Sequence, residues 1–139
     1  HDMMEKIKQG DTYELKTSFT QEQVNAFADC SLDNNPIHIN PEYAAKTPFG
    51  KPIVHGFFAG AVFSRVFGTM WPGEGTIYMS QQMSFRSPVF VGRNYVAKFE
   101  VIEVNEEKHR GLIRTTLIDE QTGKEVITGE AKLMHTDRF

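Results

Sequence analysis

A carboxylate and an imidazole stand five positions apart in the segment Asp33-Asn34-Asn35-Pro36-Ile37-His38. Because Asn and Pro restrict the backbone of this turn, Asp33 and His38 form a ready acid/base pair. Seventeen residues after His38, the pair His55-Gly56 opens a long apolar stretch. A glycine that begins a buried helix offers its backbone N–H to a developing oxyanion. These are the groups needed to add water to, or remove it from, a bond next to a carbonyl.

Each of these parts also has a plainer structural interpretation. Asp and Asn side chains often close a turn by bonding their own backbone, and an isolated His beside apolar residues is often a hydrogen-bonded structural group. Gly56 could serve helix–strand packing alone. His55 is interpreted as a residue that shapes the turn before the helix, with no catalytic role.

The segment resembles the MaoC-like (hydratase 2) family, the R-specific enoyl-CoA hydratases with a hot-dog fold. That family reads Gly-Asp-x-Asn-Pro-[Ile/Leu/Val]-His and then a small residue six places on. Leu32 stands where the family usually has Gly, a departure expected to affect the local turn. The register of the match, together with His55-Gly56 at the expected distance, favours catalysis over the plainer interpretations. The residues that match are Asp33, Asn35, Pro36, Ile37, His38 and Ala44.

The resemblance implies that Asp33 and His38 hold one catalytic water, which adds to a trans-2-enoyl-CoA to give an R-3-hydroxyacyl-CoA. It also implies that the Gly56 N–H binds the thioester oxygen and that the enzyme is a homodimer. Asn35 either braces the dyad by hydrogen bonding or is a plain turn residue. Which dyad member takes the proton of the water is left open.

Two residues of the apolar stretch are candidates for lining an acyl site. Ser64 lies two helical turns after Gly56, and the family often has Ser there. Phe67 lies eleven residues after Gly56, about three turns on, and so returns to the same helical face. It is expected to close the acyl pocket and limit substrates to short chains, or else to be a core residue.

Three other functions are weighed against a hydratase. A 3-hydroxyacyl-ACP dehydratase would use the same dyad. A hot-dog acyl-CoA thioesterase commonly carries a carboxylate on the buried helix, but residues 57–70 contain no Asp or Glu. A non-catalytic acyl-thioester-binding module would not require an acid/base pair.

Length and composition fit one domain spanning residues 1–139, with His1-Asp2 expected to be extraneous to it. A net charge of −3 without a basic run argues against nucleic acid, and no apolar run is long enough for a membrane span. The single Cys30 and the lack of a leader favour the cytoplasm. The five His residues lack metal-ligand spacing, so no metal is expected, and no cofactor beyond the coenzyme A of the substrate.

Sequence patterns predict an α+β domain with an antiparallel sheet wrapped around a long buried helix. Thr20 and Gln23 form a capping-box pattern for a helix ending near Cys30-Ser31. The apolar stretch predicts a helix over 55–70, expected to be buried on nearly all sides because it is apolar on nearly all sides. Strands are predicted at 12–17, 76–86, 94–104, 109–119 and 125–135, with a short helix at 41–46. The name hot-dog and the strand order come from the resemblance.

Overall fold

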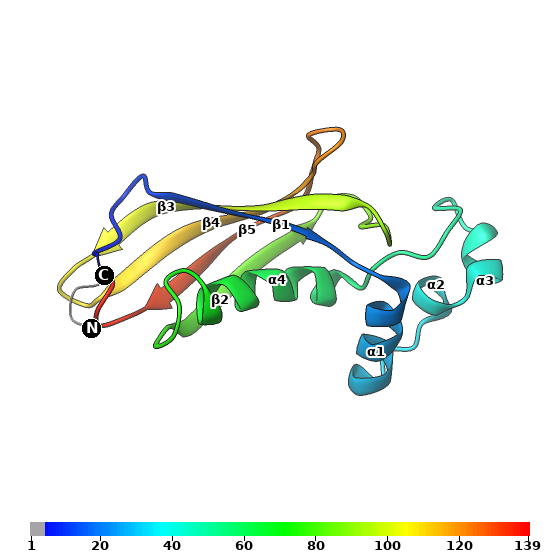
Figure 1. Cartoon of the computed structure of the whole chain (residues 1–139), viewed down its shortest axis with the longest axis horizontal. Coiled ribbons are helices and arrows are strands. Elements are labelled where there is room, and N and C mark those ends of the chain that lie inside the picture. Colours follow the sequence, from blue (N-terminus) through cyan, green and yellow to red (C-terminus); the bar gives the residue numbers. More distant parts are fainter. Residues whose placement is uncertain (1–4) are drawn as a thin grey trace.

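The computed structural model describes residues 5–139, so the expectation for His1-Asp2 lies outside the described residues. One antiparallel sheet in the order β1-β3-β4-β5-β2 curls along the long helix α4, while three shorter helices gather at one end (Figure 1). The predicted strands and helices are all present, with ends that differ by a few residues at most. In chain order they are β1 (Thr12–Ser18), α1 (Gln21–Ser31), α2 (Pro36–Ile39), α3 (Pro41–Ala45), α4 (Gly56–Thr69), β2 (Ile77–Phe85), β3 (Asn94–Asn105), β4 (Arg110–Asp119) and β5 (Glu125–Met134).

The core lies between α4 and the concave face of the sheet. Alternate residues of β3 point inward and are buried, Phe99 among them. The rings of Phe63 and Phe67 on α4 meet Phe99 edge-on, with centroid distances of 5.7 and 5.3 Å. Such edge-to-face contacts add to the stabilisation that comes from burying the rings.

Helix α4 is buried on one side only, and the expectation of burial on nearly all sides was wrong. Its sheet-facing residues, such as Ala59 and Val66, are fully buried, whereas Phe57 is 71% exposed and Ala61 and Ser64 are exposed. The reason is geometric, because a single five-stranded sheet can curl around only part of a helix. The apolar side chains on the remaining face are left at the surface.

Strand β2 forms one edge of the sheet and pairs only with β5 among the described strands. Large apolar side chains on both of its faces are exposed, including Ile77, Met79 and Phe85. A long edge strand with exposed apolar residues offers unpaired backbone groups to another chain. The edge therefore has the properties of an association surface.

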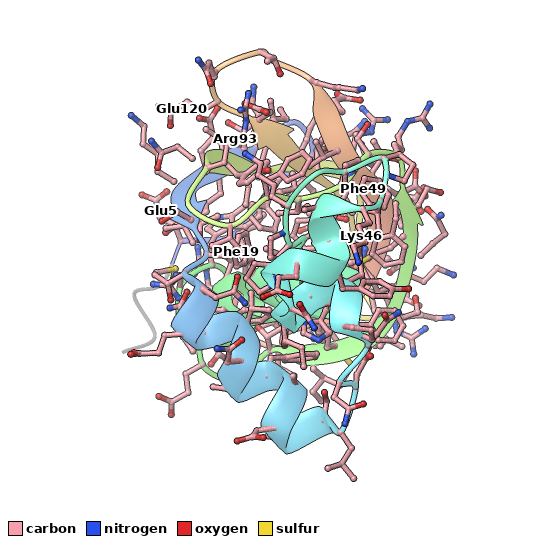
Figure 2. All side chains as sticks on the ribbon, turned by 90° about the vertical axis from the view of Figure 1, so that its right-hand side faces the viewer. Glu5, Phe19, Lys46, Phe49, Arg93 and Glu120 are labelled. Atoms are coloured by element: carbon pink, nitrogen blue, oxygen red, sulfur yellow. The ribbon has the colours of Figure 1, made fainter. Side chains whose placement is uncertain are left out.

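Helices α1, α2 and α3 cover one end of the sheet (Figure 2). The predicted capping box is confirmed: Thr20 Oγ1 accepts from the Gln23 N–H at 3.0 Å, and Gln23 Oε1 accepts from the Thr20 N–H at 3.0 Å. Helix α1 ends at Leu32, whose φ of 66° is left-handed. A left-handed conformation that favours glycine is thus adopted here by a leucine. No helix of the described residues has the length and apolarity of a bilayer-crossing segment.

Candidate active site

His38 is placed by the short helix α2. The Asn35 side chain caps this helix by accepting a hydrogen bond from the Ile37 N–H at 3.2 Å, and Pro36 occupies the first helical position. Of the two roles considered for Asn35, the structure shows the one in the turn. Capping still serves the site, because it sets the direction in which His38 leaves the helix.

The protonation state of His38 follows from its neighbours. Its Nδ1 lies 2.7 Å from the carbonyl oxygen of Ile53, and because a carbonyl can only accept, Nδ1 carries the proton. Nε2 is then an unprotonated acceptor. Burial lowers the pKa of His38 below 6.5, as does the charge of His55, while the Ile53 carbonyl and Asp33 act in the opposite direction. His38 is therefore a neutral base at pH 7.

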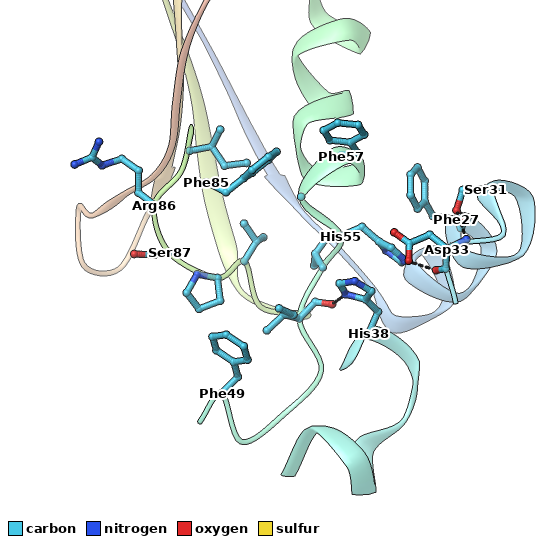
Figure 3. A pocket seen from close by; sticks show the side chains of 16 residues that line it. Phe27, Ser31, Asp33, His38, Phe49, His55, Phe57, Phe85, Arg86 and Ser87 are labelled. Carbon is cyan, nitrogen blue, oxygen red and sulfur yellow. Dashed lines mark hydrogen bonds between the residues drawn. The ribbon is translucent and has the colours of Figure 1, made fainter. Parts of the chain in front are cut away.

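Asp33 is held through its backbone while its carboxylate stays free. Its N–H donates to Ser31 Oγ at 3.1 Å, and Ser31 Oγ in turn donates to the Phe27 carbonyl at 2.6 Å. Its carbonyl oxygen accepts from His55 Nε2 at 2.9 Å (Figure 3). Within residues 5–139 the carboxylate oxygens have no hydrogen-bond partner. They are available to a water molecule or a substrate.

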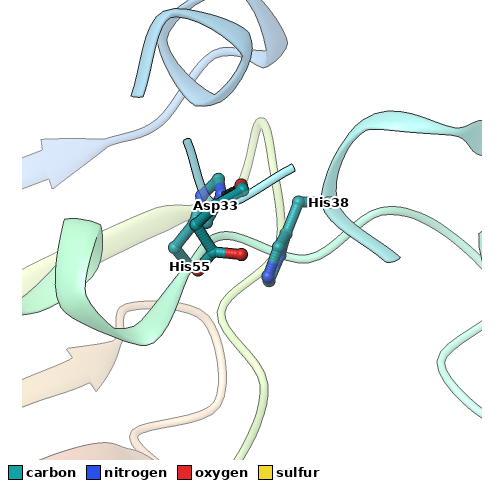
Figure 4. Close-up of side chains that lie close together, drawn as sticks. All are labelled: Asp33, His38 and His55. Carbon is teal, nitrogen blue, oxygen red and sulfur yellow. Dashed lines mark hydrogen bonds between the residues drawn. The ribbon is translucent and has the colours of Figure 1, made fainter. Parts of the chain in front are cut away.

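The structure brings Asp33, His38 and His55 together. The Asp33 carboxylate and one nitrogen of each ring lie within 4.8 Å of one another, a separation that one bridging water can span (Figure 4). The same spacing would admit a metal ion by distance alone. However, the two imidazoles are stacked, with centroids 3.9 Å apart and planes inclined by 26°. Lone pairs in nearly parallel planes do not converge on one metal ion, so the group suits a water better than a metal.

Asp33 and His38 face a cavity of about 680 Å³, a size typical of small-molecule sites. Helix α1 and the loop before α4 form one wall. The end of β2 and the following turn form the other, with Phe85 and Arg86, and Phe49 lies at the lower rim in Figure 3. The lining is mostly apolar around a few polar groups, which suits an acyl thioester.

Gly56 is the first residue of α4, so its N–H has no acceptor within the helix. It also lines the cavity. A Cβ at this position would lie 2.7 Å from Cε1 of Phe85, closer than real Cβ contacts. A larger residue would therefore force the Phe85 ring to move, a reason for glycine that the sequence did not reveal.

Ser64 and Phe67 do not line the cavity that Asp33 and His38 face. Ser64 lines a second hollow of about 420 Å³ between α4 and β2, together with Phe57 and Tyr78. Phe67 is 1% exposed and lies in the core behind Tyr78, their ring centroids being 5.2 Å apart. The spacing from Gly56 to Phe67 does place both on one helical face, but that face meets the sheet. Phe67 itself lines neither the cavity nor the hollow, and its effect on chain length stays a prediction.

Other cavity residues gave no signal in the sequence. Ile53 contributes only a backbone oxygen, and Phe85 and Arg86 lie about fifty positions from the dyad. The apolar residues on both faces of β2 are a signal that could have been used. A strand with one face in solvent carries polar residues on that face, so apolar residues on both faces could have identified Tyr78 and Phe85 as candidates for a binding surface.

Comparison with known proteins places this chain among hydratases and dehydratases. The family model described as MaoC like domain matches residues 3–123. An (R)-specific enoyl-CoA hydratase from Aeromonas caviae is 42% identical over 90% of this chain and 92% of its own length. A 3-hydroxybutyryl-CoA dehydratase from Methylorubrum extorquens is 39% identical over 91% of this chain and 80% of its own. Among solved structures, an (R)-hydratase from A. caviae involved in PHA biosynthesis superimposes with a TM-score of 0.89 at 39% identity, covering 93% of this chain and 97% of that one.

A sheet curled along one long helix, with an Asp/His pair at its open end, defines a hot-dog enzyme of the hydratase and dehydratase class. The chain belongs to the MaoC-like domain family.

Proposed function

We propose that this protein catalyses the reversible hydration of a trans-2-enoyl-CoA to an R-3-hydroxyacyl-CoA. The observation that supports this most directly is the pair formed by neutral His38, with Nε2 free to accept, and the free Asp33 carboxylate on the wall of one cavity. The hydratase and dehydratase relatives point to the same chemistry.

His38 is assigned as the base because its tautomer leaves Nε2 as the acceptor. The Asp33 carboxylate accepts one O–H of the water and orients its oxygen toward C3. His38 removes the other proton as the C3–O bond forms, and the dyad returns a proton to C2 on the same face. Water is thereby consumed with no net change in the enzyme. The product has the R configuration, as the resemblance implies.

The thioester oxygen gains negative charge during this addition, and the Gly56 N–H is proposed to stabilise it. The N-terminus of the 14-residue helix α4 adds a partial positive charge at the same place. Loss of one preorganised donor of this kind typically costs about 10²–10³ in rate. A backbone donor on a long helix has the rigidity that this role needs.

The acyl chain is proposed to run from the dyad past Phe57 into the hollow between Ser64 and Tyr78. Phe57 lines both the cavity and the hollow, so the two adjoin at this residue. Phe67 would limit the depth of the hollow from behind, by supporting the Tyr78 ring. Chains of about four to six carbons should then be preferred, because further methylenes would meet supported rings.

The reaction calls for no cofactor beyond the coenzyme A carried by the substrate, since the dyad and one water supply every proton that moves. Cys30 is an exposed free thiol, which is consistent with a reducing compartment, and we propose the cytoplasm.

The enzyme is proposed to act as a homodimer in which two β2 edges pair. The exposed apolar residues of β2 and the exposed face of α4 are adjacent, so that one partner could cover both. The acyl hollow would then lie near the subunit boundary. Light scattering at micromolar concentration should show a dimer, and a stable monomer would contradict this assembly.

Crotonyl-CoA tests the reaction. Absorbance of the conjugated thioester should fall without release of free thiol, and the product should be the R enantiomer. Thiol release would instead identify a thioesterase. If neither the absorbance nor the thiol changed, the same assay with the acyl-carrier-protein thioester would separate a change of carrier from an inactive binding module.

A further inference from the structure

His55 has an unusual environment for a residue that only precedes a helix. It is 2% exposed, and its side chain makes no capping bond to α4. Its Nε2–H instead donates to the Asp33 carbonyl oxygen at 2.9 Å, across 22 positions of sequence. Its ring stacks on His38 at 3.9 Å on one side and meets Phe27 at 4.7 Å on the other.

The other ring nitrogen of His55, Nδ1, is buried without any hydrogen-bond partner among the described residues. Leaving a buried polar atom unpaired costs free energy, so such atoms are rare and usually mark a position with a role beyond packing. A leucine or phenylalanine would fill the same space without that cost. What an imidazole adds here is the combination of a flat ring and one N–H donor.

We propose that His55 is a positioning residue for the hydration reaction, one that sets the spacing of Asp33 and His38 and attaches both to the start of α4. This inference rests on the proposed function of that dyad. The hydrogen bond holds the Asp33 backbone, and the stack holds the plane of the His38 ring. Gly56 is the next residue, so one side chain aligns the water-binding pair with the oxyanion donor.

The two contributions of His55 can be separated by substitution. In His55→Phe the flat ring remains but the donor is lost, so the Asp33 segment is released. In His55→Gln the amide can still donate to the Asp33 carbonyl, but the ring that covers His38 is gone. The first variant should act on the position of the water, and the second on the exposure of His38.

Exposure matters because burial is the main cause of the lowered pKa of His38. The charged and titratable groups around His38 are Asp33 on the preceding loop, His55 at the start of α4, and Arg86 across the cavity. Loss of the His55 ring admits water to His38 and also removes an imidazole whose charge lowers that pKa. Both changes move the pKa of His38 upward.

His135 provides a matched control. It is equally buried, at 3% exposed, and its Nε2–H donates to the Glu74 carbonyl at 2.8 Å. It lies near the C-terminus, at the end of the sheet opposite α1–α3 (Figure 1). The variant His135→Gln therefore loses the same type of side chain without touching the dyad.

The experiment measures kcat, KM and pH profiles on crotonyl-CoA for the full chain and the three variants. His55→Phe should lose about 10²-fold in kcat, as expected for a misplacement of roughly 1 Å. Its KM should change by less than about twofold, because ground-state binding is unaffected. His55→Gln should recover most of that kcat, while the acid limb of its profile moves up by about half a pH unit. His135→Gln should stay within about twofold of the parent in kcat.

A folded His55→Phe variant with parental kcat would overturn the inference, leaving His55 as a structural residue only. If His55→Phe does not fold, His55→Gln provides the test alone, and an unmoved acid limb overturns the inference. The dyad variants distinguish this failure from failure of the proposed function. If Asp33→Asn and His38→Gln are inactive while His55→Phe is fully active, only the positioning role is refuted. If the dyad variants are active, the proposed function itself is refuted.

Discussion

The sheet with α4 and the end formed by α1–α3 are stabilised in different ways. The first region is held by side chains packing on side chains, as with Phe63 and Phe67 against Phe99. The second also buries apolar residues, and in addition its polar side chains bond to distant backbone carbonyls. There His38 bonds the Ile53 carbonyl, and Gln21 Nε2 donates to the His38 carbonyl at 2.9 Å. Packing tolerates changes that conserve volume, whereas each of these hydrogen bonds requires one atom in one place.

This difference gives a physical reason for the helical end to hold the proposed active site. A catalytic pair must keep its geometry while its reactive atoms stay free, and anchoring through the backbone achieves both. Asp33 is held by its N–H and its carbonyl, which leaves its carboxylate available. His38 is held by Nδ1, which leaves Nε2 available. Substitutions at the helical end should therefore lower activity more than stability, and substitutions between the sheet and α4 should lower stability more than activity.

The largest effect is expected at the dyad. Asp33→Asn and His38→Gln should each lower kcat by about 10³-fold, within the range for loss of a general acid/base. Both variants should keep the unfolding midpoint of the parent within a few degrees. The double variant should be little worse than either single one, because both residues act on one water. A single variant that retains a tenth of the parental turnover would contradict the assignment.

In the sheet region, Phe67→Ala should lower the free energy of unfolding by about 3–5 kcal/mol, measured by urea denaturation. If Phe67 supports Tyr78, this variant should also raise activity on eight-carbon relative to four-carbon substrates. Phe63→Ala is the matched control, since Phe63 is just as buried and also packs against Phe99, but its ring does not meet that of Tyr78. It should lose similar stability with an unchanged substrate ratio. If the ratio of eight-carbon to four-carbon activity were the same in both variants, Phe67 would have no specific effect on the acyl site.

The pH dependence tests the neutral state of His38. Its pKa in the folded protein lies below 6.5, so the folded state binds fewer protons than the unfolded state between that pKa and 6.5. Stability and activity should therefore both be retained at pH 6.5 and above, and both should decline as the pH falls through the lowered pKa. A pH–rate profile of kcat/KM gives the midpoint directly. An acid limb centred above 6.5 would exclude a neutral, buried His38 as the base.

The smallest effect is expected at the end of α1. Leu32 is 80% exposed and has a φ of 66°, a conformation that costs a non-glycine residue about 1–2 kcal/mol. Leu32→Gly should raise the free energy of unfolding by about 0.5–1 kcal/mol after the entropy of glycine is counted. Leu32→Ala keeps the strained backbone and should gain nothing. A loss of stability in the glycine variant would show that the leucine side chain makes a contribution of its own.

Local patterns in the sequence were enough to predict most of the secondary structure, although the short helix α2 was expected to be part of a turn. The capping box at Thr20 begins α1 as predicted, and alternation along β3 indicates a strand whose bounds agree to within a residue. The turn from Asp33 to His38 was also recognisable, because Asn and Pro restrict it through interactions only a few residues long. These features depend on neighbours in the chain, and such information is present in the sequence itself.

The sequence did not show which side of each element meets the rest of the protein, or which groups bond to the site residues. Both were decided by the three-dimensional arrangement. Helical periodicity correctly put Gly56 and Phe67 on one face, but it could not show that this face meets the sheet while Ser64 faces the hollow. Nor could it show that the Phe85 ring lies against Gly56, or that the Asp33 carbonyl accepts a hydrogen bond from His55. Periodicity orients a side chain relative to its own element only. Which element lies opposite, and which distant carbonyl lies within hydrogen-bond reach, depends on how the whole chain packs.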